Sequence, residues 1–422
     1  MISIINRLFK KKNNLNFVKS KLQILDNTTN VSLIFDLINN FSEDSEVRFV
    51  GGCLRKILNG EEIDDIDLAT NLEPSQVCEI LSKNKIQFYE SGIEHGTVTA
   101  KIKNTKFEIT TLRKDIKTDG RHAKVEFTKD WVSDSERRDF TINAISCDFK
   151  GNLYDYHKGL QDLKKGKIKF IGDPKKRIRE DFLRILRFFR FYAYYGKNII
   201  TKSDLKIFKN QVLNLKKLSS ERVYSEFKKI LTSENPYKTL NLMKFSGVLN
   251  YIIFSSKNLE KIKLINKFDK INYLIDFITR LAILIDKKFL LRVSNKLKLS
   301  KNENNKIKKI FHLEENFNFK DFEKNKIKYI YYYGHEICES LLIYNFIKLH
   351  GNYKIDKYSK IISSIKNIKT PRLPIFGKDL IKIGFQAGPK IGKILELVES
   401  WWILRKFKPT RKECLKKLKE FD

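Results

Sequence analysis

Short apolar runs alternate with turn residues over the N-terminal third of the chain. Runs of roughly four to eight residues, rich in β-branched and aromatic side chains, are typical of strands, whereas apolar residues spaced three and four apart are typical of helices. Helices are therefore expected to begin at Cys53 and to run over Ser75–Asn84 and Asp134–Cys147. Strands are expected at Val47–Val50, Ile66–Ala69, Thr97–Lys103, Lys106–Leu112 and Lys124–Phe127.

The pattern changes at Ile178, where apolar residues begin to recur in the rhythm of an amphipathic helix. Helical patterns then continue to the C-terminus. They break near Asn235-Pro236, at Gly247 and over residues 371–377, which hold two prolines and a glycine. No internal repeat is visible. The residues that set the rhythm after the change are Ile178, Phe182, Ile185, Leu186 and Phe189.

These changes predict an α+β head with a small antiparallel or mixed sheet and helices, followed by an all-helical neck, body and tail. A chain of 422 residues is long enough for several domains and a substantial core. The expected divisions are a basic N-terminal extension (1–30), the head (31–172), the neck (173–235), the body (236–370) and a basic tail (371–422).

A glycine pair and two nearby acids are the most informative local feature. Gly51-Gly52 joins an expected strand to a helix, a turn where backbone N–H groups and the helix N-terminus favour an anion. Asp65 and Asp67 lie two apart on the next expected strand and so point to one face. Aligned carboxylates beside a phosphate site suit Mg²⁺ and two-metal phosphoryl transfer. An ordinary glycine turn and a solvated strand end would explain each half separately.

Glu108 is a candidate third carboxylate. The alternation of its strand could bring it beside Asp65 and Asp67, or it could face solvent on an edge strand. The polar stretch from Arg113 to Lys124, which contains Gly120, is expected to be a mobile loop over the site.

The segment Arg137–Ala144 mixes basic, acidic and amide side chains. If it is helical, Arg138 shares a face with Thr141 and Ile142, and Asp139 shares the adjoining face with Asn143. An arginine beside Asp139 and Asn143 could hold a triphosphate and ribose hydroxyls together. A surface ion pair is the alternative.

Asp181, Arg184, Arg187 and Arg190 recur every three residues and predict a stripe along a helix. A carboxylate accepts a hydrogen bond from an exocyclic amine, and a guanidinium donates to a ring nitrogen. Cytosine and adenine share that amine and acceptor on their pairing edges, whereas uracil and guanine carry a carbonyl in place of the amine. One Asp181/Arg184 pair could therefore accept both bases. An exposed basic face would explain the charges, but not the choice of arginine.

The net charge of +34 makes a polyanion such as nucleic acid the leading partner. The chain is also rich in Lys, Asn and Ile, so base composition of the gene could produce part of this charge. Arginine is less open to that objection, because nine of the 18 arginines lie between Arg113 and Arg190. A planar guanidinium binds phosphates or base edges through two hydrogen bonds at once.

Five scattered cysteines without a CxxC pair argue for reduced thiols in the cytoplasm and against a disulfide framework or a zinc site. No apolar run is long enough to span a membrane. The N-terminal residues include the basic run 7–12 and resemble a transit peptide faintly, but one arginine and few serines favour a simple basic extension. His335-Glu336 lacks the second histidine of a metalloprotease motif and is interpreted as helix surface.

Taken in order, the motifs resemble those of class II CCA-adding tRNA nucleotidyltransferases, in the polymerase-beta-like superfamily shared with bacterial poly(A) polymerases. The resemblance is nearly continuous from about residue 45 to 232, with a weaker match at 374–392. The motifs are GGCLR (51–55), DDIDLAT (64–70), EHGTV (94–98), FEITTLR (107–113), RRDFTINA (137–144), GLQDL (159–163), GDPKKRIREDFLRILRFFRF (172–191) and SER (220–222).

The resemblance implies that residues 31–172 form a polymerase-beta-like catalytic head in which Asp65 and Asp67 bind catalytic Mg²⁺. It implies that Gly52, Arg55 and Arg138 contact the incoming nucleotide and that Asp181 with Arg184 reads its base, while Arg187 and Arg190 match further nucleotide contacts. Family members add C, C and A from CTP and ATP to the tRNA 3′ end without a nucleic-acid template.

Three other functions remain open at the level of sequence. The chain could be a poly(A) polymerase, or it could add only CC or only A. From a different class, it could be a non-catalytic RNA-binding relic, although the presence of Asp65, Asp67, Arg138 and Asp181 argues against this.

Overall fold

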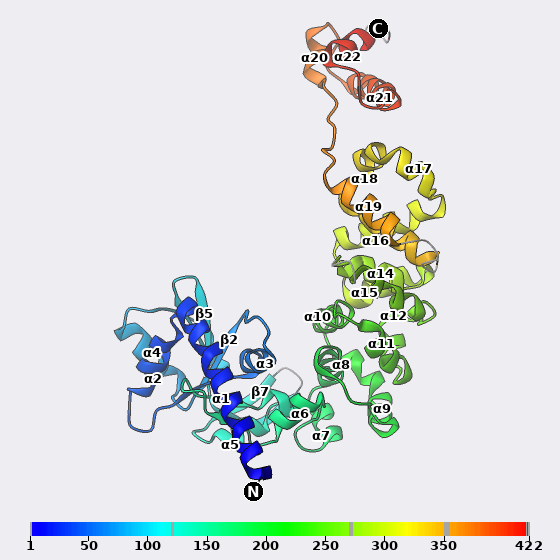
Figure 1. Ribbon diagram of the computed structural model, residues 1–422. Helices are drawn as coiled ribbons and strands as arrows, with labels where there is room; N and C mark the ends of the chain where they lie inside the picture. Colours follow the sequence, from blue (N-terminus) through cyan, green and yellow to red (C-terminus); the bar gives the residue numbers. More distant parts are fainter. Residues whose placement is uncertain (1, 120–121, 270–272, 350–354, 419, 421–422) are drawn as a thin grey trace. The chain divides into compact units, whose positions relative to one another are not determined.

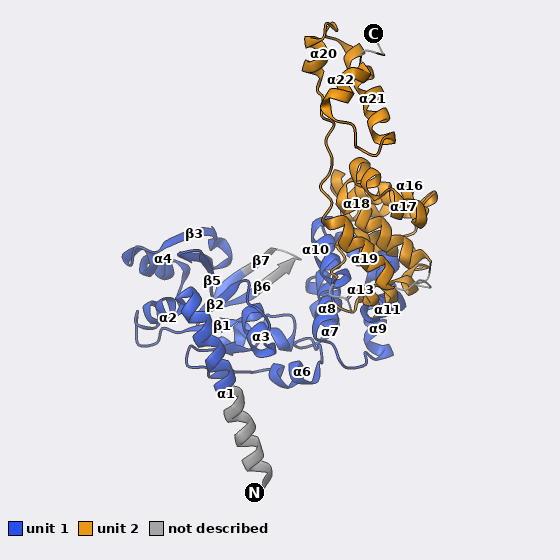
Figure 2. Cartoon of the chain, turned by 45° about the horizontal axis from the view of Figure 1, so that its top comes forward, with its two compact units in different colours: residues 1–233, 238–251 blue, residues 234–237, 252–422 orange. Residues whose placement is uncertain are grey.

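The computed structural model describes residues 2–119, 122–269, 273–349, 355–418 and 420 (Figure 1). It contains two compact units, residues 1–233 with 238–251, and residues 234–237 with 252–422 (Figure 2). Within the described residues, the strands all belong to the first unit, and the second unit is helical.

A seven-stranded mixed sheet forms the centre of the head. Its strands are β1 (Val47–Val50), β2 (Ile66–Thr70), β3 (Gln87–Gly92), β4 (Thr97–Ile102), β5 (Thr105–Thr111), β8 (Ser146–Cys147) and β9 (Leu153–Tyr154). Their spatial order is β3-β4-β5-β2-β1-β8-β9. β2 runs parallel to β5, and every other neighbouring pair is antiparallel. The predicted α+β class, with a mixed sheet and then a helical remainder, is confirmed.

The head core forms where the buried face of the sheet meets short amphipathic helices. Phe49, Leu68 and Ile109 from three adjacent strands pack there, together with Leu54 from the helix that follows the glycine pair. The helices of the head are α1 (Ile2–Thr29), α2 (Val31–Asn39), α3 (Gly51–Asn59), α4 (Pro74–Lys83), α5 (Trp131–Glu136) and α6 (Gly159–Lys165), with 3₁₀ turns η1 (Ile93–His95) and η2 (Thr141–Asn143). Val18, Leu22 and Leu25 of α1 belong to the same core.

The helix predicted over Asp134–Cys147 is wrong. α5 ends at Glu136, Phe140 forms a β-bridge with Phe170, and β8 pairs with β1 through Cys147 and Phe49. These tertiary pairings, with full burial of the Phe140 ring, outweigh the local helical spacing. The proposed sharing of helix faces by Arg138, Asp139 and Asn143 is wrong for the same reason.

The expected loop between Arg113 and Lys124 is also wrong. Instead, this segment forms an antiparallel hairpin of two strands, β6 (Arg113–Asp119) and β7 (His122–Phe127). Arg113 pairs with Phe127 in this hairpin. Polar residues hide a strand from a periodicity argument when neither face is strongly apolar. Gly120 lies outside the described residues.

Helices build the rest of the first unit, and four phenylalanine rings join them to the head. Phe140 and Phe170 of the head contact Phe188, and Phe188 contacts Phe208. The helices are α7 (Pro174–Glu180), α8 (Leu183–Tyr195), α9 (Lys202–Lys209) and α10 (Ser220–Leu231), with η3 (Val212–Lys217). Most of α11 (Pro236–Phe245) and α12 (Val248–Ile253) also belongs to this unit. The predicted breaks at Asn235-Pro236 and Gly247 are confirmed.

The amphipathic helix predicted from Ile178 is interrupted. Asp181 is extended, with φ −150° and ψ 112°, and separates α7 from α8. Asp181 therefore precedes the helix that carries Arg184, Arg187 and Arg190, so the four residues do not form one continuous helical stripe.

The second unit is a stack of helices that ends in a small cluster of its own. Its elements are η4 (Leu259–Ile265), α13 (Asn266–Asp269), α14 (Phe277–Leu284), η5 (Lys287–Phe289), α15 (Leu290–Leu297), α16 (Lys301–Glu315), α17 (Phe319–Lys324), α18 (Lys326–Lys348), α19 (Ile355–Lys366), α20 (Gly377–Lys382), α21 (Pro389–Leu404) and α22 (Arg411–Leu418). The predicted break over residues 371–377 is confirmed as the segment before α20. No described helix is long and apolar enough to cross a membrane.

Candidate active site

The glycine pair forms the turn between β1 and α3. Gly51 has φ +62°, a left-handed conformation that glycine adopts without steric strain. The backbone N–H groups of Gly52 and Cys53 act on the Asp67 carboxylate in the direction that lowers its pKa. A Cβ on Gly51 would lie 3.4 Å from Asp67 Oδ2 and 3.6 Å from Arg138 Nη1. The turn therefore holds Asp67 and Arg138 beside the same backbone.

The structure brings Asp65, Asp67 and Glu108 together. Asp67 pairs in register with Glu108 across the parallel strands β2 and β5, and Asp65 directly precedes β2. Burial and repulsion from Asp65 raise the pKa of Asp67, against the two backbone N–H groups and Arg138. Burial, then the charges of Asp67 and Asp65, raise the pKa of Glu108. Like charges are thus held close enough to disfavour one another.

This carboxylate set has the chemistry of a divalent-cation site. A cation would relieve the repulsion that raises the pKa values of Asp67 and Glu108. Among the described residues, no group of three or more His, Cys, Asp or Glu side chains is placed to hold a metal by itself. Mg²⁺ commonly takes one or two carboxylates and completes its shell with water and substrate phosphates, so the residues fit an ion shared with a nucleotide. Burial raises the pKa of the neighbouring Cys53 thiol to about 12, which keeps it protonated.

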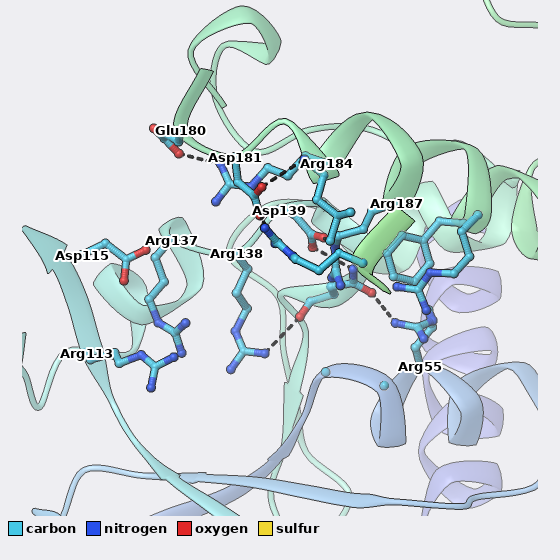
Figure 3. A pocket seen from close by; sticks show the side chains of 17 residues that line it. Arg55, Arg113, Asp115, Arg137, Arg138, Asp139, Glu180, Asp181, Arg184 and Arg187 are labelled. Atoms are coloured by element: carbon cyan, nitrogen blue, oxygen red, sulfur yellow. Dashed lines mark hydrogen bonds and ion pairs between the residues drawn. The ribbon is translucent and has the colours of Figure 1, made fainter. Parts of the chain in front are cut away.

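Two cavities adjoin at the glycine turn. The first, of about 580 Å³, lies between the head and α8 and is rich in guanidinium groups (Figure 3). The second, of about 350 Å³, holds Asp65 and Asp67 with Tyr194, Tyr195 and Lys229. Gly52, Arg55, Arg190 and Phe191 line both cavities. Of the predicted site residues, the first cavity is lined by Gly51, Gly52, Arg55, Arg138, Asp139, Asn143, Asp181, Arg184, Arg187 and Arg190.

Arg55 and Arg138 are fixed at the head side of the first cavity. Arg138 forms an ion pair of 3.0 Å with Asp134 and donates to the carbonyl oxygen of Asn143 at 3.3 Å. Arg55 Nη1 donates to Asn143 Oδ1, and its guanidinium lies 4.8 Å from the Phe191 ring centroid. Asn143 therefore orients both arginines.

Asp139 joins the head to α8. Asn143 Nδ2 donates to its Oδ1 at 2.8 Å, and Arg187 Nε lies 2.6 Å from its Oδ2. Burial opposes the charged carboxylate, but Arg187 and these hydrogen bonds hold the pKa of Asp139 below its ordinary value. The Asp139–Asn143 neighbourhood that a helix was expected to create arises instead from the tight turn before η2.

The four residues of the predicted stripe each have an internal partner. Arg187 pairs with Asp139, and Arg190 Nε lies 2.7 Å from Glu226 Oε2. Arg184 Nη1 donates to Glu180 Oε2 at 2.5 Å and to the carbonyl oxygen of Arg177 at 2.8 Å. Asp181 accepts from Arg222 at 2.7 Å and from the Leu183 N–H at 3.0 Å.

The side chains of Asp181 and Arg184 therefore have different partners, and the two residues are hydrogen-bonded only through the backbone, where the Arg184 N–H donates to the Asp181 carbonyl oxygen at 3.1 Å. Both nevertheless line the first cavity (Figure 3).

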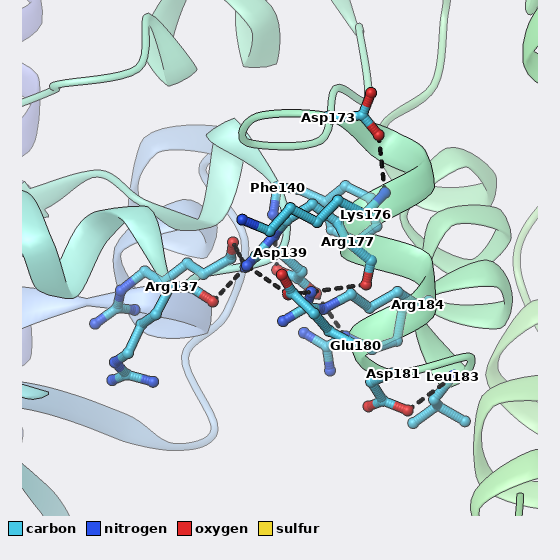
Figure 4. Close-up of polar contacts among 12 residues, drawn as sticks. Arg137, Asp139, Phe140, Asp173, Lys176, Arg177, Glu180, Asp181, Leu183 and Arg184 are labelled. Carbon is cyan, nitrogen blue, oxygen red and sulfur yellow. Dashed lines mark hydrogen bonds and ion pairs between the residues drawn. The ribbon is translucent and has the colours of Figure 1, made fainter. Parts of the chain in front are cut away.

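Arg177 connects α7 to the backbone that carries the head-side arginine and aspartate. Its Nη2 donates to the carbonyl oxygens of Arg137 at 2.5 Å and Arg138 at 2.6 Å, and its Nη1 donates to Glu180 (Figure 4). Sequence reasoning did not select Arg177, although its position within the arginine-rich window was a signal. Arg177 itself does not line the first cavity, whereas five polar residues that the sequence reasoning also did not select do line it: Arg113, Asp115, Arg137, Glu180 and Arg222.

Two family models and several relatives of known name match this chain. A family model described as "Poly A polymerase head domain" matches residues 47–169, and one described as "Probable RNA and SrmB- binding site of polymerase A" matches residues 200–259. The mitochondrial CCA tRNA nucleotidyltransferase 1 of Mus musculus is 33% identical over 402 residues, which is 90% of this chain and 87% of the mouse protein. The chain belongs to the CCA-adding tRNA nucleotidyltransferase family.

Bacterial members of the family give the same result. The CCA-adding enzyme of Staphylococcus haemolyticus is 31% identical over 89% of this chain and 94% of its own length. The crystal structure of the Bacillus stearothermophilus CCA-adding enzyme in complex with CTP has a TM-score of 0.75 and 22% identity, and the match covers 92% of this chain and 97% of that one. The structural match shows that the family fold extends over nearly the whole chain.

Proposed function

We propose that this protein adds CMP and AMP from CTP and ATP to the 3′ end of tRNA, without a nucleic-acid template, and so builds and repairs the CCA end. The observation that carries the proposal is the carboxylate pair Asp65/Asp67, which adjoins a cavity lined by both Asp181 and Arg184. The relatives named as CCA-adding enzymes support the same reaction. Neither the site nor these relatives favours poly(A) synthesis.

The reaction is in-line displacement at the α-phosphorus of the bound nucleoside triphosphate. The tRNA 3′-hydroxyl forms the new P–O bond, and the bond to the leaving pyrophosphate breaks. Mg²⁺ held by Asp65 and Asp67 together with the triphosphate would supply charge stabilisation and activate the hydroxyl. Glu108, which pairs with Asp67 on the neighbouring strand, would add a third carboxylate near that ion.

Positioned cations and polar side chains of the head and of α8 bind the triphosphate and the ribose of the nucleotide. Arg138 and Arg55 direct guanidinium groups to the triphosphate from the glycine turn, where Gly51 and Gly52 leave room for phosphate oxygens. Asp139 and Asn143 present a carboxylate and an amide to the ribose hydroxyls. Arg187 and Arg190 place charge along α8 on the opposite wall. Preorganised charge of this kind is commonly the largest contribution to such rate enhancements.

Base choice depends on Asp181 and Arg184. Each oxygen of Asp181 already accepts one protein hydrogen bond and keeps a further lone pair for an exocyclic amine. Arg184 uses Nη1 for its two internal contacts, which leaves other N–H groups for a ring nitrogen. CTP and ATP meet both requirements, and UTP and GTP do not.

The high net charge of +34 supports tRNA binding through phosphate contacts and shape. We further propose a reducing compartment, the cytoplasm, on the grounds that all five cysteines are free thiols. The mouse relative is named mitochondrial, so fractionation of cells expressing the tagged protein is the direct test of compartment.

One incorporation matrix tests the reaction. Purified protein is given tRNAs ending before the first C, after one C and after CC, with each of the four nucleoside triphosphates separately and together. CCA addition predicts C on the first two substrates, A on the third, and termination after A. Runs of A would indicate a poly(A) polymerase, activity on a subset would indicate a CC-only or A-only enzyme, and binding without incorporation would indicate a non-catalytic protein.

The raised pKa of Asp67 predicts that kcat/KM begins to fall at an unusually high pH on the acid side (the acid limb) of its pH profile. Burial raises that pKa, and the neutral acid is a poor cation ligand, so kcat/KM should fall with decreasing pH at a higher pH than an ordinary aspartate would cause. More Mg²⁺ should move the limb to lower pH, because metal and proton compete for the same oxygens. Profiles of pH at two Mg²⁺ concentrations test this; superimposable limbs would contradict it.

The same shift has a consequence for stability without metal. A folded-state pKa above the unfolded value means that stability is lost as pH rises through the folded pKa. Asp67→Asn should therefore raise the Tm of the metal-free protein at neutral pH. Measuring the Tm of Asp67→Asn and of the wild type without metal separates an effect on folding from an effect on metal binding.

Arg177→Ala should lower kcat/KM roughly 10- to 100-fold, because its two hydrogen bonds to backbone carbonyls hold Arg138 and Asp139 in place and small misplacements of reacting groups are costly. Arg177→Lys should restore part of the loss, and Arg179→Ala, an exposed arginine on the same helix, should change little. Steady-state kinetics beside thermal unfolding measure this. Equal losses in Arg177→Ala and Arg179→Ala would refute a positioning role for Arg177.

A further inference from the structure

A group of three guanidinium groups lies at one end of the first cavity. Arg113 begins β6, and Arg137 and Arg138 follow α5 directly (Figure 3). All three line the cavity, together with Asp115. The sequence-based assignment gave a role only to Arg138, so Arg113 and Arg137 have no assigned ligand.

The acids near this group do not satisfy Arg113. Asp134 pairs with Arg137 at 2.7 Å and with Arg138 at 3.0 Å, and it accepts only the backbone N–H of Arg113, at 3.3 Å. In the described part of the chain, Nε and Nη1 of the Arg113 side chain are buried without any hydrogen-bond partner. Two donors of a charged group are thus removed from water and unused, which is costly unless a ligand supplies the acceptors.

The guanidinium of Arg113 is partly shielded from water and also lies close to another positive charge. Burial, and then the charge of Arg137, lower the pKa of Arg113 to about 10, against the attraction of Asp115 and Asp134. The guanidinium remains charged at neutral pH, so its charge is disfavoured first by burial and second by repulsion from Arg137. An anion placed between Arg113 and Arg137 would remove that repulsion.

Two buried arginines of this protein show what a purely structural role looks like. Arg48 pairs with Glu46 at 2.6 Å and lies 3.5 Å from the Tyr154 ring centroid and 4.0 Å from that of Trp131. Arg280 Nε donates to the Ile275 carbonyl oxygen at 3.0 Å. Within the residues described, the guanidinium of Arg113 has no comparable acid, carbonyl or ring. A core-packing role does not account for it.

We propose that Arg113, together with Arg137, forms a second phosphate-binding subsite in the first cavity, distinct from the Gly51-Gly52 turn. The inference rests on the proposed function, because the phosphate has two possible sources in that reaction. One source is the terminal phosphates of the nucleotide and the leaving pyrophosphate. The other is a backbone phosphodiester near the 3′ end of the RNA. Both present the oxygens that a planar guanidinium binds through two hydrogen bonds.

The test compares Arg113→Gln with Arg179→Gln, which removes the same charge from an exposed position outside the first cavity. Calorimetry without RNA measures the affinity of inorganic pyrophosphate and of CTP, and steady-state kinetics measure KM for CTP and for tRNA. A charged hydrogen-bonded group predicts a loss of about 10- to 100-fold at the subsite. Arg113→Lys, which keeps the charge without the planar fork, should show a smaller loss.

The outcomes separate the two sources. Weaker pyrophosphate binding in Arg113→Gln assigns the subsite to the nucleotide phosphates. Unchanged pyrophosphate binding with a raised KM for tRNA assigns it to the RNA backbone. Unchanged values for pyrophosphate, CTP and tRNA in a folded Arg113→Gln protein overturn the proposal. If that variant does not fold, the same measurements on Arg137→Gln decide between these outcomes.

Thermal unfolding also distinguishes a ligand-binding role of Arg113 from a structural one, because the two roles predict opposite effects of Arg113→Gln on stability. Removal of an unpaired buried charge should leave Arg113→Gln at least as stable as the wild type, whereas loss of a core-packing arginine should destabilise it. Calorimetric pyrophosphate binding does not require turnover. A wild type that binds pyrophosphate through Arg113 but incorporates no nucleotide would refute the proposed function and leave the subsite intact.

Discussion

Asp67→Ala is expected to reduce nucleotide incorporation by more than about 10³-fold while leaving the affinity for tRNA within about twofold. Loss of a single preorganised electrostatic group costs roughly 10² to 10³ in rate, and Asp67 is proposed to hold the metal as well. It is also the residue on which the glycine turn, Asp65, Arg138 and Glu108 converge. Single-turnover incorporation of CTP and a filter-binding assay with tRNA measure the two quantities.

Asp64→Ala is the matched control for this prediction. Asp64 is the neighbouring acid, but it is exposed and pairs with Lys56 at 2.5 Å. Its replacement should change incorporation only severalfold. Near-normal incorporation by Asp67→Ala, or an equally large loss in Asp64→Ala, would contradict the assignment of the metal-binding pair.

Asp181→Asn is expected to lower the preference for CTP over UTP by on the order of 10²-fold. The carboxylate accepts from the cytosine amine and repels the uracil carbonyl, whereas an asparagine amide can donate to that carbonyl. Sites built around a specific hydrogen bond discriminate strongly because the wrong partner leaves buried polar groups unpaired. The ratio of kcat/KM for the two nucleotides on a tRNA lacking its first C is the measurement.

Two controls separate base reading from loss of the Asp181–Arg222 ion pair. Arg222→Gln removes that pair but keeps the Asp181 carboxylate, and should retain most of the selectivity. Asp173→Asn changes an acid at the start of α7 that caps the helix through its side chain, and asparagine caps equally well. If Arg222→Gln relaxes selectivity as much as Asp181→Asn does, the discrimination depends on the ion pair.

The sequence was sufficient for the parts of the head whose pattern is local. The strands around Val47–Val50 and Ile66–Ala69 are short apolar runs in sequence, and both are buried strands in the structure. Asp65 and Asp67 line the same cavity, although Asp65 lies just before β2 and not on the strand from which the period of two was argued. The position of Glu108, which local alternation left open, depends on the parallel pairing of β2 with β5, a contact over some forty residues of sequence.

The errors share one cause, which is that tertiary contacts outweighed local spacing. Residues 134–147 have helical spacing, but Phe140 is buried against three aromatic rings from two other segments, and Cys147 completes a strand pair with Phe49. The extended backbone at Asp181, which breaks a helical pattern, allows its side chain to reach Arg222 on α10.

The internal partners of the arginines could not be derived from spacing. Glu180 for Arg184, Asp139 for Arg187 and Glu226 for Arg190 come from three different parts of the chain. The concentration of arginine between residues 113 and 190 was a correct signal for the region, but it could not show which arginines are paired and which, like Arg113, are not.

The central claim is that Asp65 and Asp67 hold a divalent ion jointly with a nucleoside triphosphate at the glycine turn. Electron paramagnetic resonance of Mn²⁺ tests it most directly, because free and bound ions give different signals and no turnover is needed. With CTP present, the wild type should retain bound Mn²⁺, and the double variant Asp65→Ala/Asp67→Ala should release it while still folding. Equal retention of Mn²⁺ by the two proteins would contradict the account.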